Sequence, residues 1–283
     1  MRRITLLTDF GTADGYVASM KGVMATTLPG VHLDDVAHDL DQGDVEGAAR
    51  ALGRYWSLWP RGTVHLVVVD PGVGTERRGM AVRADDRFLV GPDNGIFSRV
   101  LETCGSWTAV ELATGEGLPL GPPASRTFHG RDLFAPAAAF LARGGHISRL
   151  GPSMGDPVLL PGTEPSLGPE VSEGRVMSAD RFGNLITNLP GELLDGVEEV
   201  EVEGTSVPVG RTYADVEPGQ PLALPNSDGL LEVAARDDSA ARVLGAGPGA
   251  VVRVVAGGGV SPPRASGGLP PKAGPAPGSA APA

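Results

Sequence analysis

Four short polar segments of this chain carry residue types that can do acid–base chemistry or bind a ligand. Each combines glycine with aspartate, asparagine, arginine or histidine, and they lie at 8–11, 70–78, 92–95 and 127–132. The second segment follows the apolar run 65–69, which is typical of a strand covered on both faces and is ended by Pro-Gly. Because ligands bind beyond the carboxyl ends of strands in open α/β sheets, we expect these segments to converge on one cleft.

Asp70, Arg77 and His129 form the set with the most defined chemistry. A carboxylate, a permanent cation and an imidazole that acts near neutral pH can together hold and polarise a water molecule. Each also has a structural interpretation, since Asp70 can close its own turn and a lone histidine is more often structural than catalytic. Arg78 is the alternative to Arg77, because either guanidinium can turn inward.

Two other kinds of site are disfavoured by the spacing. The glycines of 72–77 match neither the dinucleotide fingerprint nor the Walker pattern, so we expect no nucleotide triphosphate. Residues 38–44 hold a histidine and three aspartates, but helix capping explains the aspartates better than a metal does. Residues 93–95 are better explained as a turn into a helix than as ligands. We therefore expect no metal and no cofactor.

The composition indicates a globular protein without a nucleic-acid or membrane partner. The 283 residues are 41% hydrophobic, and the net charge of −11 is unlike the clustered lysine and arginine that nucleic acids need. No window reaches the roughly 18 apolar residues of a spanning helix, and the first residues begin a strand instead of a signal peptide. The single cysteine, Cys104, excludes an internal disulfide. We expect a cytoplasmic protein that binds a small, cationic ligand.

Residues 1–155 are expected to form an N-terminal α/β domain with a mostly parallel sheet. Strand-like and helix-like periodicities alternate along this region, as in βαβ units. The expected strands are 4–7, a short one near 31, 64–69, 79–82 and 88–90. The expected helices are 16–27, 45–59, 95–103 and 132–143, the second of them capped by Asp41 or Asp44.

A different pattern follows a linker rich in glycine and proline at 156–170. Residues 171–257 contain short strands and turns and are expected to form a smaller C-terminal β-barrel domain, with a sandwich as the alternative. The expected strands are 174–179, 198–202, 205–209, 221–224, 230–233 and 250–255. Residues 258–283 are too poor in apolar side chains to offset the entropy of ordering, so we expect a disordered tail.

Five motifs of the chain occur in the order in which one enzyme family carries them. They are Thr8-Asp9-Phe10-Gly11, Asp70-Pro-Gly-Val-Gly-Thr, Gly91-Pro-Asp-Asn-Gly, Thr127-Phe-His-Gly-Arg-Asp and Asp180-Arg-Phe-Gly-Asn184-Leu-Ile-Thr-Asn188. Together they resemble the S-adenosyl-L-methionine (SAM) hydroxide adenosyltransferases, relatives of the adenosyl fluorinase and chlorinase, over about residues 3–256. The resemblance implies an N-terminal α/β domain, a C-terminal β-barrel, and a homotrimer that binds SAM between one subunit's N-terminal domain and a neighbour's C-terminal domain.

The resemblance also implies a role for each matched residue. The catalytic residues would be Asp70, Arg77 and His129, since the spacing to the family's pattern selects Arg77. The substrate-binding residues would be Asp9 at the ribose hydroxyls, Asp14 near the methionine end, Asp180 at the ammonium, Asn184 at the adenine edge, Ser227 at the carboxylate, and Phe182 and Tyr213 as walls of the purine pocket. Two positions depart from the fluorinase, which has tryptophan at the place of Ile186 and arginine at that of Asp228.

Hydrolysis of SAM to adenosine and L-methionine is the reaction that the resemblance implies. A sulfonium leaves as a neutral thioether, so attack at the ribose 5′ carbon needs little acid assistance, whereas water must be given hydroxide character. One alternative is a halide-dependent adenosyl transferase that makes a 5′-halo-5′-deoxyadenosine. The carboxylate of Asp70 disfavours it, because two unit charges about 4 Å apart interact by about 4 kcal/mol at an effective dielectric of 20. The other alternative is an adenosyl-ligand sensor without turnover, which would not need Asp70, Arg77 and His129 together.

Overall fold

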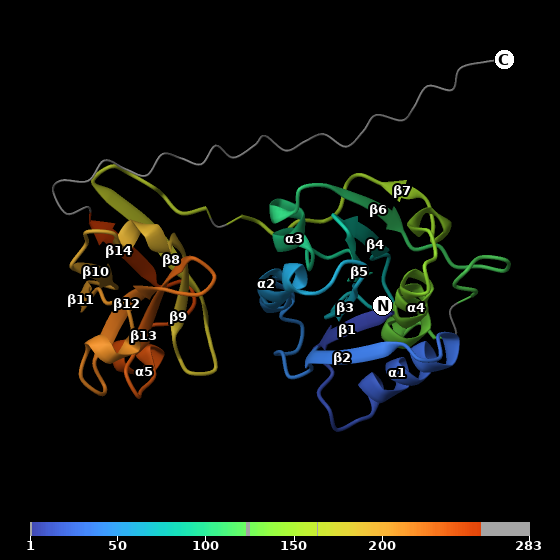
Figure 1. The fold of residues 1–283 in the computed structure, drawn as a ribbon, viewed down its shortest axis with the longest axis horizontal. Coiled ribbons are helices and arrows are strands. Elements are labelled where there is room, and N and C mark those ends of the chain that lie inside the picture. Colours follow the sequence, from blue (N-terminus) through green and yellow to red (C-terminus); the bar gives the residue numbers. More distant parts are fainter. Residues whose placement is uncertain (1, 123–124, 163, 256–283) are drawn as a thin grey trace, which may run out of the picture. The chain divides into compact units, whose positions relative to one another are not determined.

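The computed structural model describes residues 2–122, 125–162 and 164–255 of the chain. These residues form two compact units, one ending at Pro161 and the other beginning at Gly162 (Figure 1). Over the described ranges, no helix is long and apolar enough to cross a membrane. The expected tail, 258–283, lies outside the described residues.

A seven-stranded sheet in the order β2-β1-β3-β5-β4-β6-β7 forms the centre of the first unit. Its strands are β1 (Arg3–Thr8), β2 (His32–Ala37), β3 (Val64–Val68), β4 (Gly79–Ala84), β5 (Arg87–Pro92), β6 (Trp107–Glu111) and β7 (Ser153–Met154). The pairs β1–β2, β1–β3 and β3–β5 are parallel, whereas β4–β5, β4–β6 and β6–β7 are antiparallel. The expectation of a mostly parallel sheet is therefore correct only for the half that contains β1, β2, β3 and β5.

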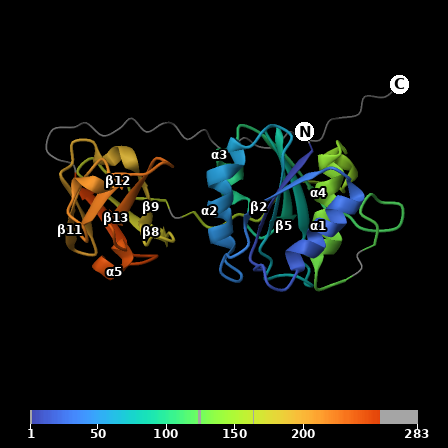
Figure 2. The same ribbon diagram turned by 60° about the horizontal axis from the view of Figure 1, so that its bottom comes forward.

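Helices cover both faces of this sheet, which gives the unit three layers. Figure 2 shows α1 (Tyr16–Thr27) and α4 (Ala135–Ala142) on one face and α2 (Val45–Tyr55) and α3 (Ser98–Thr103) on the other. Each face has its own apolar core, because the strands are buried on both sides. The first unit also contains short helical turns at η1 (Trp56–Leu58), η2 (Gly130–Phe134) and η3 (Ile147–Arg149).

The ends of three helices differ from the sequence expectation. Helix α3 begins at Ser98 instead of residue 95, and the other two differ for local reasons. Helix α2 begins where expected, since the Asp44 side chain accepts a hydrogen bond from the Gly47 amide, but it ends at Tyr55 and continues as the tighter turn η1. Before α4 the chain makes a wide π-helical turn, η2, in which the Ala135 amide donates to the Gly130 carbonyl five residues back. His129 stands directly before this turn.

The second unit is a seven-stranded antiparallel sheet in the order β11-β10-β14-β8-β9-β13-β12. Its strands are β8 (Val171–Ala179), β9 (Leu185–Pro190), β10 (Glu199–Val202), β11 (Thr205–Pro208), β12 (Pro221–Pro225), β13 (Leu230–Ala235) and β14 (Val251–Val255), with the helix α5 (Ala240–Leu244) and the turns η4 (Gly191–Leu194) and η5 (Tyr213–Asp215). A bridge between Val209 and Ala223 connects the two outermost strands. The sheet is thus nearly closed around a core of valine, leucine and alanine, which makes the unit barrel-like.

The segment expected as a linker pairs with both units. At its start, the Val158 amide donates to Asp93 Oδ1 and the Leu160 amide donates to Ser98 Oγ, both at 2.8 Å. Further along, Ser166 forms a two-hydrogen-bond bridge to Glu173 of β8. The backbone of residues 156–170 is therefore hydrogen-bonded to the first unit near its start and to the second unit near its end.

Candidate active site

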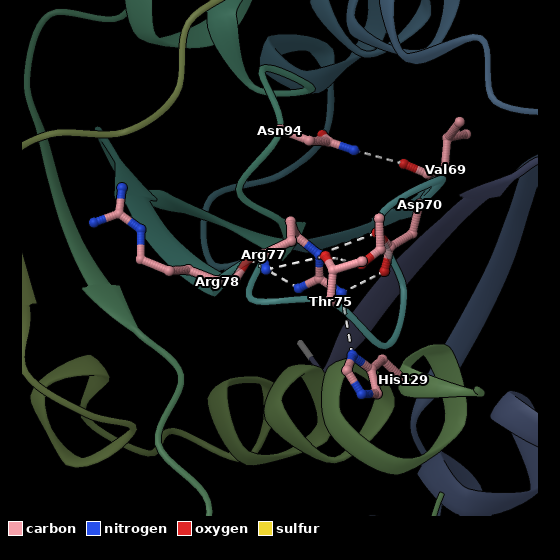
Figure 3. A network of polar contacts seen from close by, with 8 residues as sticks. Val69, Asp70, Thr75, Arg77, Arg78, Asn94 and His129 are labelled. Carbon is pink, nitrogen blue, oxygen red and sulfur yellow. Dashed lines mark hydrogen bonds and ion pairs between the residues drawn. The ribbon is translucent and has the colours of Figure 1, made fainter. Parts of the chain in front are cut away.

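Asp70, Arg77 and His129 come together at the end of β3, as the sequence predicts (Figure 3). Arg77 reaches Asp70 with two hydrogen bonds, from Nε to Oδ1 at 3.0 Å and from Nη2 to Oδ2 at 2.5 Å. The same Nη2 lies 3.1 Å from His129 Nδ1. Only 9% of the Arg77 side chain and 5% of the Asp70 side chain are exposed. A permanent cation is thus held between a carboxylate and an imidazole.

The guanidinium of Arg77 is fixed on all sides. Besides the two bonds to Asp70, its Nη1 donates to the Arg78 carbonyl at 2.9 Å, and its Cζ lies 5.3 Å from the centre of the Phe134 ring in η2. The bidentate geometry gives this ion pair a defined direction that a single contact would not. Arg77 is therefore preorganised before any ligand binds.

The electrostatics of the site keep His129 neutral near pH 7. Burial and the neighbouring Arg77 charge lower the pKa of His129, and the carboxylates of Asp70 and Asp132 oppose this only in part. Because arginine is always a donor, His129 Nδ1 accepts from Arg77 and the ring proton is assigned to Nε2. The lone pair of the imidazole ring is therefore on Nδ1, the nitrogen that faces the Arg77 guanidinium.

The structure resolves the choice between the two arginines. The Arg78 side chain points away from Asp70 and His129 (Figure 3). It donates from Nε to Asp93 Oδ2 at 2.9 Å and binds Asp156 through Nη1 and Nη2. Asp93 is buried and also accepts from the segment after β7, so Arg78 and Asp93 hold that segment to the first unit.

Structural contacts also account for the other polar residues near this edge. Asn94 donates to the Val69 carbonyl at 2.9 Å, and this contact holds the turn after β5 against the end of β3. Buried His38 contacts Thr8 and Asp35, and Asp44 caps α2. Among the described residues, no group of three or more His, Cys, Asp or Glu side chains is arranged to hold a metal ion.

Asp9 and Asp14 lie on the loop between β1 and α1. Asp9 is half-buried, and its Oδ2 accepts the Gly43 amide at 2.9 Å, where Gly43 has a left-handed φ of 76° that favours glycine. Asp14 is exposed. Asp9 therefore sits at the same strand-end edge as Asp70, with one carboxylate oxygen tied to the backbone.

In the second unit, Asp180 and Asn184 contact each other across the turn between β8 and β9. Asp180 Oδ1 accepts the amides of Phe182 and Asn184, both at 2.9 Å, and Oδ2 accepts Asn184 Nδ2 at 3.1 Å. Phe182, at the tip of this turn, is 77% exposed. The carboxylate thus shapes the turn that presents the phenyl ring.

Tyr213 has a buried carboxylate partner that sequence reasoning missed. Its hydroxyl donates to Glu232 Oε1 at 2.9 Å, and Glu232 is buried within β13 while Tyr213 is 48% exposed. Burial first, then the hydrogen bond to Glu232 and the charge of that carboxylate, raise the pKa of Tyr213. The signal in the sequence is one acidic residue inside the otherwise apolar run 230–235.

Ser227 lies on the exposed turn between β12 and β13. Asn226 Oδ1 organises this turn by accepting the amides of Asp228 and Leu230. The expected binding residues of the second unit therefore come from three segments, which are the β8–β9 turn, η5 and the β12–β13 turn.

Comparison with known proteins assigns the chain to a family. Residues 4–151 match the SAM hydroxide adenosyltransferase N-terminal domain, and residues 174–253 match the C-terminal domain of the same family. The chain belongs to the SAM hydroxide adenosyltransferase family, as its motifs predict.

Three relatives illustrate the range of similarity. A protein of Thermus thermophilus named (R)-S-adenosyl-L-methionine hydrolase is 43% identical over 90% of this chain and 100% of its own length. A fluorinase of an Actinoplanes species is 29% identical over 82% of this chain and 90% of its own length. The crystal structure of an uncharacterized conserved protein from Thermotoga maritima, 33% identical, superimposes with a TM-score of 0.82 over 89% of this chain and 100% of that chain.

Proposed function

We propose that this protein hydrolyses SAM to adenosine and L-methionine by attack of water at the ribose 5′ carbon. The observation that carries the proposal is the buried Asp70–Arg77–His129 arrangement, in which a fixed cation adjoins the lone pair of a neutral imidazole. Family membership and the relatives named as hydrolases support the same reaction.

The proposed reaction balances with one water and one proton acceptor. The water oxygen bonds to the 5′ carbon, the carbon–sulfur bond breaks, and its electron pair stays on sulfur, which leaves as the neutral thioether of methionine. In this step the attacking water would displace the direct hydrogen bond between Arg77 Nη2 and His129 Nδ1, accept a hydrogen bond from Nη2 and give a proton to Nδ1. Arg77 would stabilise the hydroxide character that develops, and Asp70 would hold Arg77 in place.

The other site residues would bind the substrate. In this proposal Asp9 takes the ribose hydroxyls, Asp180 the ammonium group and Ser227 the carboxylate. Asn184 takes the adenine edge, Phe182 and Tyr213 are the purine walls, and Asp14 lies near the methionine end. Since the sulfonium is lost as a neutral group, the reaction needs no metal and no cofactor. Dialysis against a chelator should therefore leave the rate unchanged, and a loss restored by added metal would refute this part.

Water is favoured over halide as the nucleophile, but by less than the charge of Asp70 alone suggests. Arg77 occupies both oxygens of Asp70, so the pair is close to neutral and repels an anion less than an isolated carboxylate would. The stronger argument is the imidazole, because a halide has no proton to give to His129. The fluorinases are also the more distant relatives.

Product identification tests the function directly. The purified protein is incubated with SAM of each sulfonium configuration, with and without chloride, and the products are identified by mass. We expect adenosine and methionine, and preferential use of the (R) epimer for which the hydrolase relatives are named. A 5′-halonucleoside would support the transferase, and intact SAM in every sample would support a sensor.

We further propose a cytoplasmic homotrimer with each site shared between subunits. The first unit would supply the catalytic residues with Asp9 and Asp14, and a neighbour's second unit would supply the other binding residues. Mixing an Asp70→Ala protein with an Asp180→Ala protein should then restore part of the activity through hybrid trimers. Absence of rescue, with subunit exchange demonstrated by mass, would place the whole site within one chain.

A further inference from the structure

A chain of polar side chains runs behind the loop that carries Asp9. Lys21 Nζ lies 2.5 Å from Asp35 Oδ2, Asp35 Oδ1 lies 3.0 Å from His38 Nε2, and His38 Nδ1 lies 2.8 Å from Thr8 Oγ1. His38 and Thr8 are buried, whereas Asp35 and Lys21 are partly exposed. We call these four residues the His38 chain.

The hydrogen bonds of the His38 chain have one consistent direction. Asp35 accepts from Lys21 and from His38 Nε2, so a ring proton is assigned to Nε2, and Nδ1 is assigned as the acceptor of the Thr8 hydroxyl. Thr8 Oγ1 then has a lone pair for the Phe10 amide, which lies 3.3 Å away. The hydrogen bonds thus run in one direction from the Phe10 amide to Asp35, and the buried end of the chain terminates on the backbone of the loop.

Two further contacts fix the same loop at residues 9–11. The His38 carbonyl accepts the Gly11 amide at 2.7 Å, and Asp9 Oδ2 accepts the Gly43 amide at 2.9 Å. His38 thus holds the loop on one side of Asp9 through its ring and on the other through its backbone.

The loop also touches the catalytic segment. The Phe10 ring packs edge-to-face on Phe128 with ring centres 6.0 Å apart, and a side chain at Gly130 would come within 3.2 Å of both rings. Phe128 and Gly130 flank His129 in sequence. A shift of the loop would therefore move Asp9 directly and press on the segment that carries His129.

We propose that His38 is a positioning residue for recognition of the ribose hydroxyls, acting through Thr8 to aim Asp9. The inference rests on the role of Asp9 in the proposed function. His38 touches no substrate in this assignment; its effect is to hold the loop so that the free oxygen of Asp9 meets the two hydroxyls.

The first unit contains a matched control for this inference. His65 of β3 is also buried, and its Nδ1 lies 2.8 Å from the hydroxyl of Thr5, another threonine of β1. Thr5 lies in the middle of the strand, whereas Thr8 is its last residue. Replacing His65 removes the same kind of buried contact without touching the loop.

Calorimetric binding of adenosine and of 2′,3′-dideoxyadenosine tests the inference without requiring turnover. His38→Gln should weaken adenosine binding about tenfold, the loss expected for a misplaced hydrogen bond to a charged group, and leave dideoxyadenosine binding unchanged. His38→Asn, which keeps an acceptor facing Thr8, should restore binding to within about threefold of the wild type. His65→Asn should lower the melting temperature but leave both dissociation constants unchanged.

Two outcomes would overturn the inference. Equal weakening for the two nucleosides, or no weakening at all, would mean that His38 only stabilises the fold. If the His38 variants do not fold, Asp35→Ala carries the same test, because that side chain is 45% exposed and its loss leaves His38 in place. A wild-type protein that binds adenosine through its hydroxyls but does not hydrolyse SAM would refute the proposed function and leave the role of His38 intact.

Discussion

The candidate site residues of the two units differ in how closely they already contact other residues and in how much of their surface is exposed. In the first unit, Asp70, Arg77 and His129 are joined by hydrogen bonds of 2.5 to 3.1 Å and are mostly shielded from water. In the second unit, Phe182 and Tyr213 keep large exposed surfaces.

This difference follows from what each group has to do. Stabilising a developing charge requires donors that are fixed before the reaction, because reorganisation during the reaction costs energy. A binding surface contributes free energy when a ligand or a neighbouring subunit buries it, so it stays exposed to solvent until that partner binds. The comparison therefore predicts that changes to Asp70, Arg77 and His129 affect kcat and fold stability, whereas changes to the exposed residues Phe182 and Tyr213 of the second unit affect KM alone.

Arg77→Gln should give the largest effect. It leaves Asp70 as an unpaired buried charge, so we expect kcat to fall by at least about 10³-fold and the free energy of unfolding to fall by about 3–5 kcal/mol. Steady-state kinetics and denaturant unfolding measure the two losses. Arg78→Gln is the matched control, because it also breaks a pair with a buried aspartate but should leave kcat within about threefold. Equal losses of kcat in both variants would contradict the separation of the two arginines.

His129→Asn should lower kcat by about 10²- to 10⁴-fold, the range for removal of a general base, while KM changes by less than about threefold. Asparagine keeps an acceptor near Arg77 but cannot take a proton at neutral pH. The measurement is product formation over a range of SAM concentrations. If kcat and binding fell by the same factor, His129 would be a binding residue instead.

Acid should destabilise the first unit before the second. All five histidines of the chain lie before residue 150, and burial lowers the pKa of His65 from 6.5 to about 3. The unfolded chain therefore binds a proton that the folded unit does not, so stability falls as the pH drops from 6.5 towards 3, by about 2 kcal/mol at pH 5. Hydrogen exchange resolved by unit measures this. His65→Asn should flatten the pH dependence of the first unit, and an unchanged slope would contradict the assignment to His65.

Phe182→Ala should give the smallest effect. Stacking of a base on an aromatic ring contributes about 1–3 kcal/mol, so we expect KM to rise about tenfold, with kcat unchanged and unfolding altered by less than about 0.5 kcal/mol. Leu58→Ala is the control, because Leu58 is equally exposed but lies in η1 of the first unit. A loss of kcat in Phe182→Ala would break the comparison between the two units.

The sequence predicts those elements whose signals are local. Helix α1 matches its expected range, the cap of α2 at Asp44 is correct, and β3 falls within the expected 64–69. Strands β6, β7 and β9 were not predicted. Strand β7 has only two residues, and β9, Leu-Ile-Thr-Asn-Leu-Pro, lacks apolar–polar alternation and lies inside a motif that suggested ligand binding. The early end of α2 and the wide turn of η2 depend on packing against the sheet, which periodicity does not record.

Site residues divide in the same way. The convergence of Asp70 and His129 follows from strand-end topology, and Arg77, which the spacing of the family pattern selects, is the arginine that contacts both. The partners of Tyr213 and Thr8 were missed, because Glu232 and His38 meet them through space across 19 and 30 residues. The assigned roles of the residues in substrate binding and catalysis stay predictions for the experiments above.

The wide turn of η2 makes the position of His129 depend on chain length as well as on residue type. A π-helical turn holds one residue more than an α-helical turn, and α4 after it is anchored in the core. Deleting one residue from 130–134 would allow an ordinary helix to form and would rotate His129 about 100° around the axis. A one-residue deletion there would therefore move the imidazole away from Arg77 without changing the residue type at 129, so the length of this turn positions His129 as much as its sequence does.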